Sequence, residues 1–202
     1  MLKVARDQPE EVRARLAEAL AFDMVLSTGG VSVGQFDHVK GVMDELGLRQ
    51  LFHGVAQRPG RPLKFGTIGG RPIFGLPGNP VSTMVCFYLY VRPALLRMRG
   101  ATETGLPRLS VRCAEPIKLA ANLTEFVRVR LERRGAEVLA STTGYQGSGV
   151  LSSLSRADGL LIGPAAVSLL KGGDQATVLL LVPGAGVDCS AFFEARPLRQ
   201  AN

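Results

Sequence analysis

The segment FDMVLSTGGVSVG, residues 22–34, decides the fold, because it is a short apolar run that ends in a glycine-rich turn. The run predicts a buried strand, and the turn predicts a change of direction into a helix. A second segment, IFGLPGNPVS at residues 73–82, repeats this order of strand, turn and helix. Such turns, placed at the carboxyl ends of neighbouring strands in an α/β domain, form one crevice that binds anions. The two segments therefore predict an α/β domain with an anion site.

Helical patterns flank both segments. Apolar residues recur at helical spacing in residues 8–20, after Asp7, and again in residues 38–46. Residues 80–97 predict a long helix with Asn79 as its N-cap, and this helix is apolar on nearly all sides, which is typical of burial in a core or under a partner subunit. Three short strands are predicted between these helices, at residues 51–57, 62–67 and 71–75.

A different pattern follows the turn residues 100–107. Apolar and polar residues alternate with a period of two in several segments, separated by glycine turns, which predicts a small all-β barrel or sandwich. We therefore expect an α/β domain at residues 1–106, a β domain at 107–183 and a loose tail at 184–202. Glu125, Arg128 and Arg130 are expected on the wet face of a strand.

Composition narrows the classes of function. The net charge is +7, with 24 Lys and Arg against 17 acidic residues, but the basic residues form no long run. A nucleic-acid-binding surface is more clustered, so a pocket for a small anion is favoured over nucleic acid. The longest apolar stretch, residues 81–91, is too short to cross a membrane, so we expect a cytoplasmic protein. The three cysteines lack zinc or disulfide spacing, and Cys86 is expected in the core.

The first turn has the chemistry of a phosphate site. Glycine lets backbone N–H groups approach an anion, and hydroxyl donors stand beside the glycines. Asp37 follows the turn, where it either binds Mg²⁺ against a phosphate or caps the next helix, and both roles stay open. The second turn is stiffened by two prolines, and it is either an anion site or a rigid structural turn.

Other polar residues are weaker candidates. Arg58 and Arg61 flank a Pro-Gly turn, where two guanidinium groups suit a tetrahedral oxyanion, although exposed arginines are more often only solvated. The segment QGSG at 146–149 is either a ligand loop or a hairpin turn. Lys40 and Lys64 are expected mainly at the surface.

The two turns together carry a family resemblance. Thr28–Gly34 followed by Asp37 strongly resembles the molybdopterin-binding domain of molybdenum cofactor biosynthesis proteins. Gly75–Ser82, after the segment PGRP at 59–62, is similar to the molybdopterin molybdotransferase family, whose eukaryotic relative is the E domain of gephyrin. The segments EFVR at 125–128, QGSG at 146–149 and ADGL at 157–160 agree with it, so the resemblance covers residues 4–182.

The resemblance implies a three-layer molybdopterin-binding domain and a β domain that together insert molybdenum into adenylylated molybdopterin. The substrates would be adenylylated molybdopterin and molybdate, Mg²⁺ would be required, and AMP would be released. The resemblance also implies a cytoplasmic homodimer, with the molybdopterin adenylyltransferase as a candidate partner. Neither nucleic acid nor a membrane is expected as a binding partner.

Site residues follow from the same resemblance. Asp37 and Asp7 would be catalytic, with Asp37 also holding the metal, although a helix cap is an alternative role for Asp7. The substrate would contact Thr28, Gly29, Gly30, Ser32, Gly34, Pro77, Gly78, Asn79 and Pro80. Molybdate would be bound by Arg58, Arg61, Ser82 and Ser148.

The chain also departs from the family. The resemblance covers about the C-terminal half of the family, so the molybdopterin-binding domain is expected to be incomplete at its N-terminus and to lack an acidic Thr-Gly-Asp-Glu motif. Arg58 and Arg61 stand where lysine is common, and Asn122-Leu123 replaces a Gly-Arg pair. Two alternatives stay open: a non-catalytic molybdopterin-binding module, and the adenylyltransferase, which the β region disfavours.

Overall fold

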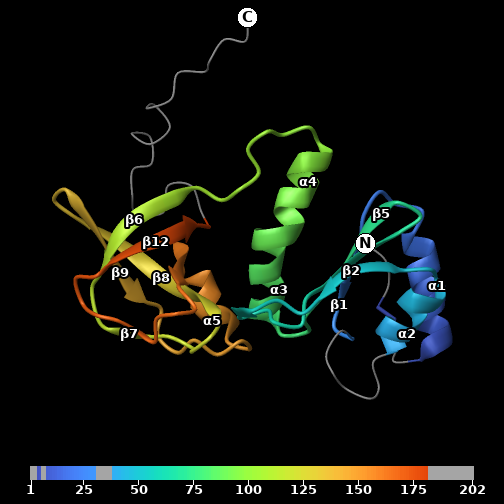
Figure 1. Cartoon of the computed structure of the whole chain (residues 1–202), viewed down its shortest axis with the longest axis horizontal. Helices are drawn as coiled ribbons and strands as arrows, with labels where there is room; N and C mark the ends of the chain where they lie inside the picture. The colour runs from blue at the N-terminus through green and yellow to red at the C-terminus, as the bar shows by residue number, and fades with distance from the viewer. Residues whose placement is uncertain (1–3, 6–7, 31–37, 182–202) are drawn as a thin grey trace, which may run out of the picture. The chain divides into compact units, whose positions relative to one another are not determined.

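The computed structural model describes residues 4–5, 8–30 and 38–181. The chain folds as two compact units, Met1–Gly105 and Leu106–Asn202 (Figure 1). Along the first unit the order of elements is α1 (Pro9–Ala19), β1 (Val25–Thr28), α2 (His38–Glu45), β2 (Arg49–His53), β3 (Gln57–Arg58), β4 (Lys64–Ile68), β5 (Arg71–Leu76), α3 (Pro80–Cys86), the π-helix η1 (Phe87–Val91) and α4 (Arg92–Met98).

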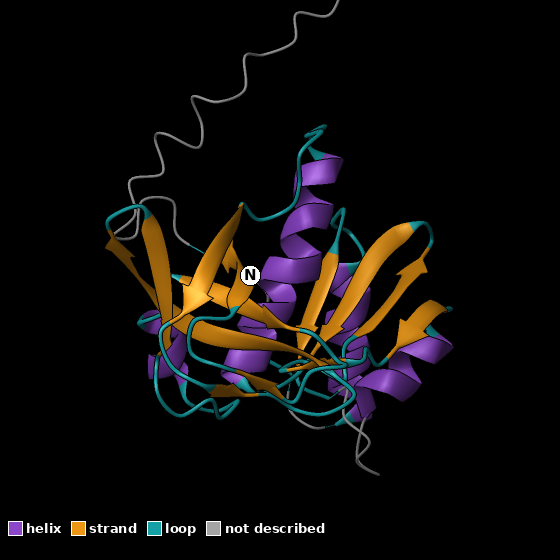
Figure 2. Ribbon diagram, turned by 60° about the vertical axis from the view of Figure 1, so that its left-hand side comes forward, coloured by secondary structure: helices purple, strands orange, loops and turns teal. Residues whose placement is uncertain are grey.

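A sheet with the order β1-β5-β4-β2 forms the middle of the first unit. β1 and β5 are parallel, whereas β5 with β4 and β4 with β2 are antiparallel. Helices cover both faces, as Figures 1 and 2 show. On one face, side chains of α1 and α2 pack on the sheet in a core of Val12, Leu16, Val25, Val42, Met43, Ile68 and Ile73. On the other face, α3 and η1 contribute to a core of Leu63, Phe74, Leu76, Cys86 and Val91. The predicted three-layer α/β architecture is confirmed.

Two helices of this unit differ in detail from the prediction. α1 has Gln8 as its N-cap, with no side-chain capping bond, and Pro9 occupies the first helical turn, where its missing N–H costs nothing. The predicted cap Asp7 lies outside the described residues. The helix predicted at 80–97 begins as expected after Asn79, but it is interrupted by η1, whose widened turn lets the N–H of Arg92 donate to the carbonyl of Phe87.

The second unit is a small barrel. Its elements are β6 (Arg108–Cys113), β7 (Ile117–Lys118), β8 (Thr124–Arg134), β9 (Glu137–Thr142), α5 (Leu151–Ser155), β10 (Gly159–Gly163), β11 (Leu169–Leu170) and β12 (Gln175–Leu180). Strands pair in the order β10-β12-β6-β9-β8, and β8 pairs again with β10, which closes the sheet on itself. The closure decides for a barrel over a sandwich.

Alternation along β8 places its valines in the barrel core. Val127 and Val129 belong to this core, and Arg130 is exposed as predicted. The prediction for Glu125 and Arg128 is wrong, because only 6% of Glu125 and 1% of Arg128 are exposed. Glu125 is in phase with the inward valines and accepts a hydrogen bond from the N–H of Ala120 at 2.6 Å. Arg128 has the opposite phase, and a later part of the chain covers it.

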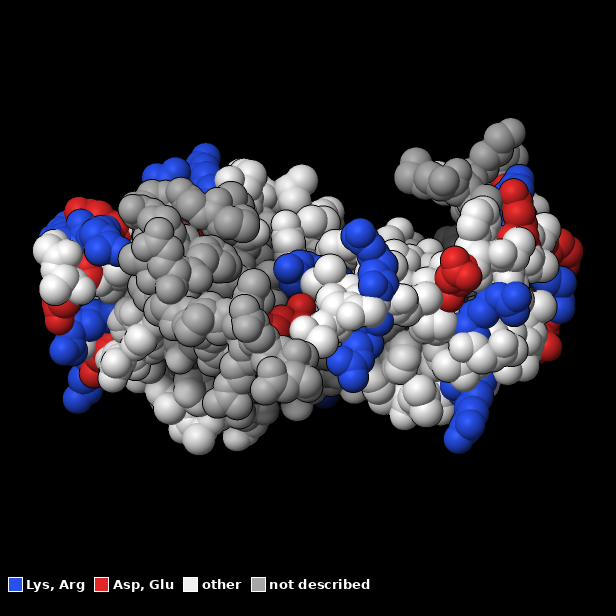
Figure 3. All heavy atoms as spheres, turned by 90° about the horizontal axis from the view of Figure 1, so that it is seen from above, with Lys and Arg blue, Asp and Glu red and all other residues white. Residues whose placement is uncertain are grey.

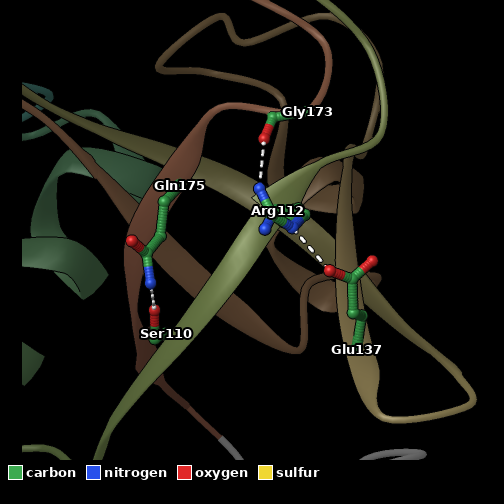
Figure 4. Close-up of polar contacts among 5 residues, drawn as sticks. All are labelled: Ser110, Arg112, Glu137, Gly173 and Gln175. Atoms are coloured by element: carbon green, nitrogen blue, oxygen red, sulfur yellow. Dashed lines mark hydrogen bonds and ion pairs between the residues drawn. The ribbon is translucent and has the colours of Figure 1, made fainter.

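Other polar side chains on the barrel join neighbouring strands at its surface. Arg112 pairs with Glu137 at 2.6 Å and donates to the carbonyl of Gly173 at 3.0 Å, and Gln175 donates to the hydroxyl of Ser110 at 2.8 Å (Figure 4). These exposed contacts link β6 with β9 and β12. Exposed pairs of this kind add little to stability, so the barrel depends mainly on its apolar core.

Candidate anion-binding site

The two glycine-rich turns lie side by side at one edge of the sheet. Thr28 at the end of β1 is the register partner of Leu76 at the end of β5, so both parallel strands end at the same level. The N–H of Gly29 donates to the carbonyl of Leu76 at 3.0 Å. A Cβ atom placed on Gly78 would lie 3.5 Å from the Cα of Gly29. The described parts of both turns therefore approach each other closely, with only backbone at the point of contact.

The backbone of the first turn needs glycine. Gly29 and Gly30 have φ angles of +80° and +68°, a region that residues with a side chain rarely adopt. Ser27, immediately before the turn, has a buried hydroxyl with no hydrogen-bond partner in the part of the chain that the structure describes. A buried hydroxyl without a partner costs free energy, so this atom is a candidate for bonding to a bound molecule.

Thr83 holds the second turn in place, a role that the sequence analysis missed. Its hydroxyl donates to the carbonyl of Pro77 and contacts the carbonyl of Asn79 at 3.1 Å, and its N–H also donates to that Asn79 carbonyl at 2.9 Å. The sequence signal for this role was a threonine in the first turn of the predicted helix, because such a hydroxyl can bond back to the carbonyls of the preceding loop. The turn is therefore fixed at both ends, by β5 and by α3.

The turn that carries Arg58 and Arg61 packs against α3. Both arginines are exposed, and the backbone between them is anchored. The N–H of Val55 donates to the carbonyl of Arg61 at 2.9 Å. A Cβ atom on Gly60 would lie 3.6 Å from the carbonyl oxygen of Ser82, a buried residue of α3. Three of the residues predicted to bind molybdate, Arg58, Arg61 and Ser82, thus lie in two segments of the first unit that pack against each other.

Lys64 is not at the surface as predicted. Only 1% of the residue is exposed, and its ammonium group pairs with Asp44 of α2 at 3.4 Å. Burial follows from its place in β4, where Lys64, Gly66 and Ile68 face the same way and Ile68 joins the core under α2. The side chain of Lys40 lies outside the described residues.

The fourth predicted molybdate residue, Ser148, belongs to the second unit. It lies between β9 and α5, so the hairpin interpretation of QGSG is wrong. The side chain of Arg128, on β8, holds this segment: its guanidinium donates to the carbonyl of Gly147 at 3.2 Å and to the hydroxyl of Ser153 at 3.1 Å. The side chain of Gln146 bonds in both directions to the backbone of Arg128, at 2.9 and 3.2 Å. A buried cation therefore underlies the loop that carries Ser148.

Several predicted residues cannot be placed. Asp7, Ser32, Gly34 and Asp37 lie outside the described residues. Within residues 4–5, 8–30 and 38–181, no three His, Cys, Asp or Glu side chains gather as metal ligands would. The described residues therefore supply no cluster of three such ligands for Mg²⁺, and Asp37, which was predicted to hold the metal, is not among them.

Cys86 confirms the expected core cysteine and leads to a prediction. Burial raises the pKa of the Cys86 thiol from 9.0 to about 12. Above pH 9 the unfolded chain carries a thiolate while the folded protein keeps the proton, so stability falls as the pH rises from 9 towards 12. The decline from this group approaches about 1.4 kcal/mol per pH unit. Urea unfolding at pH 8 to 11 should show a shallower decline for Cys86→Ala than for the unsubstituted protein, whereas equal slopes would contradict the assignment.

On the face shown in Figure 3, blue Lys and Arg side chains are scattered among other residues without forming a continuous stripe over the described atoms. No helix within the described residues combines the length and apolar character needed to cross a bilayer.

Comparison with known proteins agrees with the two units. Residues 1–97 match the family described as "Probable molybdopterin binding domain", and residues 110–181 match "MoeA C-terminal region (domain IV)". A molybdopterin molybdenumtransferase of Staphylococcus epidermidis is 30% identical over 181 residues, which cover 89% of this chain and 43% of that protein. Gephyrin of Dictyostelium discoideum is 33% identical over 185 residues, which cover 80% of this chain and 26% of that one.

Solved structures give the same relationship. The crystal structure of a molybdopterin biosynthesis MoeA protein from Pyrococcus horikosii superposes with a TM-score of 0.70 at 32% identity, covering 88% of this chain and 42% of that one. A molybdenum cofactor biosynthesis protein from Pyrococcus furiosus gives 0.67 at 29% identity, covering 88% and 56%. The chain thus spans less than half the length of the curated relatives named above.

Proposed function

Because the chain belongs to the MoeA/gephyrin E-like family of molybdenum cofactor biosynthesis proteins, we propose that its first unit binds adenylylated molybdopterin between the two glycine-rich turns. The reaction proposed for the protein is molybdenum insertion into that substrate, with cleavage of its pyrophosphate bond and release of AMP. Molybdopterin binding with a role in molybdenum cofactor biosynthesis is the part of this proposal that the family relationship supports most directly.

The observation that carries the proposal is the contact between the turns. β1 and β5 are parallel neighbours, so the N–H groups and hydroxyls that follow them lie at one sheet edge. Glycines at 29 and 78 leave no side chain where the turns meet. Ligands of open α/β sheets bind in such a crevice, outside the carboxyl ends of the strands. The buried hydroxyl of Ser27 beside this crevice has no hydrogen-bond partner among the described residues, which supports a bound polar group.

Molybdate is proposed to bind at the turn of Arg58 and Arg61. Two arginines three residues apart present planar arrays of N–H donors, which suit the oxygens of a tetrahedral dianion. Ser82 is proposed to contribute from α3, and Ser148 of the second unit stays a separate prediction. Asp37 and Asp7 remain the proposed catalytic acids, and a homodimer remains the proposed assembly. Positioning two anions beside each other would lower the barrier mainly by removing the entropy cost of bringing them together.

The decisive experiment measures binding and turnover separately. The full chain is titrated with adenylylated molybdopterin, and AMP release is then followed with and without molybdate. Molybdate-dependent AMP release is the expected result. Binding without AMP release would instead favour the non-catalytic binding module, and formation of adenylylated molybdopterin from ATP and molybdopterin would favour the adenylyltransferase. No binding at all would contradict the proposal.

Gly78→Val tests the crevice itself. The valine methyl groups would extend into the space where Gly78 approaches Gly29. We therefore expect the affinity for adenylylated molybdopterin to fall at least about tenfold. The free energy of unfolding should change little, because Gly78 is exposed. Gly105→Val is the control, since Gly105 is also exposed and has no atom within 4 Å of its added Cβ. Equal affinity in both variants would show that the substrate does not bind between the turns.

A further inference from the structure

A buried chain of polar groups supports the arginine turn from behind. Gln57, of which only 3% is exposed, donates from Nε2 to the carbonyl of Pro59 at 2.9 Å. Its Oε1 accepts a hydrogen bond from the hydroxyl of Tyr90 at 2.5 Å. The thiol of Cys86 donates to the carbonyl of Gly60 at 3.5 Å. Both carbonyls between Arg58 and Arg61 are thereby held by side chains that lie behind the turn.

These contacts come from one stripe of the long helix. Cys86 and Tyr90 are spaced four residues apart, so they follow one side of α3 and η1, and each contacts the segment 57–60. The carbonyl oxygen of Ser82, four residues before Cys86, faces the same segment, 3.6 Å from where a Cβ atom on Gly60 would lie. Tyr90 lies within η1, where the N–H of Arg92 bonds five residues back to Phe87. A π-helical turn alters which direction the following side chains face, and such turns are frequent at functional sites.

From these contacts we propose that Gln57 and Tyr90 are positioning residues that fix the backbone from which Arg58 and Arg61 bind a tetrahedral oxyanion. This inference rests on the proposed function of that turn. Tyr90 holds the amide of Gln57 in one orientation, because its hydroxyl donates to Oε1 and leaves Nε2 directed at Pro59. The amide in turn holds the turn at a set distance from the helix. Neither side chain needs to touch the anion.

A contribution to the stability of the fold does not by itself explain why these buried groups are polar. Replacing both partners of a buried hydrogen bond by apolar groups of similar shape is often neutral for stability, and the aromatic and aliphatic core around Phe74 and Leu63 could accept such groups. A satisfied polar network does fix one geometry, which apolar contacts do less well. Two exposed guanidinium groups that must meet one small anion require that geometry.

Tyr90→Phe tests the inference, with Tyr88→Phe as the matched control in the same π-helical turn. The full chain is titrated calorimetrically with molybdate, a tetrahedral dianion, and with nitrate, a planar monoanion. We expect Tyr90→Phe to weaken molybdate binding by about three- to tenfold, the range of one hydrogen bond, and to lower the ratio of molybdate to nitrate affinity. Tyr88→Phe should change neither value. Gln57→Met, which keeps the size of the side chain and removes its amide, should act like Tyr90→Phe.

The possible outcomes separate this inference from the proposed function. If the unsubstituted protein does not prefer molybdate to nitrate, the oxyanion site and the inference both fail. If that preference exists and Tyr90→Phe and Gln57→Met retain it, the inference fails while the site stands. A fall in both affinities by the same factor, with a smaller folded fraction, would show a purely structural role and would also overturn the inference.

Discussion

Replacing Gly60 with alanine is expected to lower the free energy of unfolding by about 3 kcal/mol. Gly60 has a φ angle of +99°, which an alanine adopts only with strain. The added Cβ would lie 2.5 Å from the sulfur of Cys86 and 2.8 Å from Nε2 of Gln57, both of which are buried. Because these atoms anchor the arginine turn, the variant should also lose molybdate binding. Urea unfolding and calorimetric titration with molybdate measure the two effects.

Gly70→Ala is the control that separates strain from collision. Gly70 also has a positive φ angle, +80°, but no atom lies within 4 Å of an added Cβ. This variant should therefore cost only about 1 kcal/mol and leave molybdate affinity unchanged. If the two alanine variants were equally stable, the tight packing of the arginine turn against α3 would be contradicted.

Arg128→Ala is expected to have a comparable or larger effect, about 3–5 kcal/mol. The substitution leaves a cavity in a site that is almost completely buried, and it removes donors from the carbonyl of Gly147 and the hydroxyl of Ser153. The loop that carries Ser148 then loses its support, so molybdate-dependent AMP release should fall further than stability alone explains. The free energy of unfolding and the rate of AMP release, measured where the variant is folded, test both parts.

Arg130→Ala provides the comparison on the same strand. Arg130 is exposed and donates only to the carbonyl of Arg156, at 3.3 Å, among the contacts that the described residues show for it. Its replacement should change stability by less than about 1 kcal/mol. A similar loss in the two variants would mean that burial of Arg128 contributes nothing specific to the barrel.

Much of the fold follows from periodicity in the sequence. β6 and the part of β8 from Val127 onward alternate apolar and polar residues because one face of each strand lies against the barrel core, and this pattern is local. The pairing of β1 with β5 could also be anticipated, since both apolar runs end in glycine turns. The class and the order of the main elements were therefore predictable.

Burial of charged residues was not predictable in the same way. Arg128 alternates out of the barrel core as a wet-face residue does, but the loop at Gly147 and α5 cover it, and these lie about twenty residues further along the chain. Lys64 is buried because β4 places it on the face of the sheet that α2 covers, where Asp44 of α2 pairs with it. Both results depend on contacts between segments distant in sequence, which local hydropathy does not encode.

The site shows the same division. Glycines and prolines marked both turns, because their backbone requirements are local. Thr83, Gln57 and Tyr90 went unnoticed as supporting residues, since their roles depend on carbonyls presented by other segments. The π-helical turn was likewise hidden, because FYLYV has the composition of an ordinary buried helix.

The adjacency of β1 and β5 also bears on how such proteins should be sought and redesigned. Between the two glycine turns the chain makes α2, β2, β3 and β4 before it returns beside its starting strand. Residues added to or deleted from a surface connection between β1 and β5 would change the number of residues between the two glycine turns, but the turns would stay in contact. A search pattern should thus leave that spacing open and require only that each turn follow a buried strand. Among the connections between β1 and β5, those other than the Arg58–Arg61 turn offer room for loop grafts that leave the proposed site unchanged.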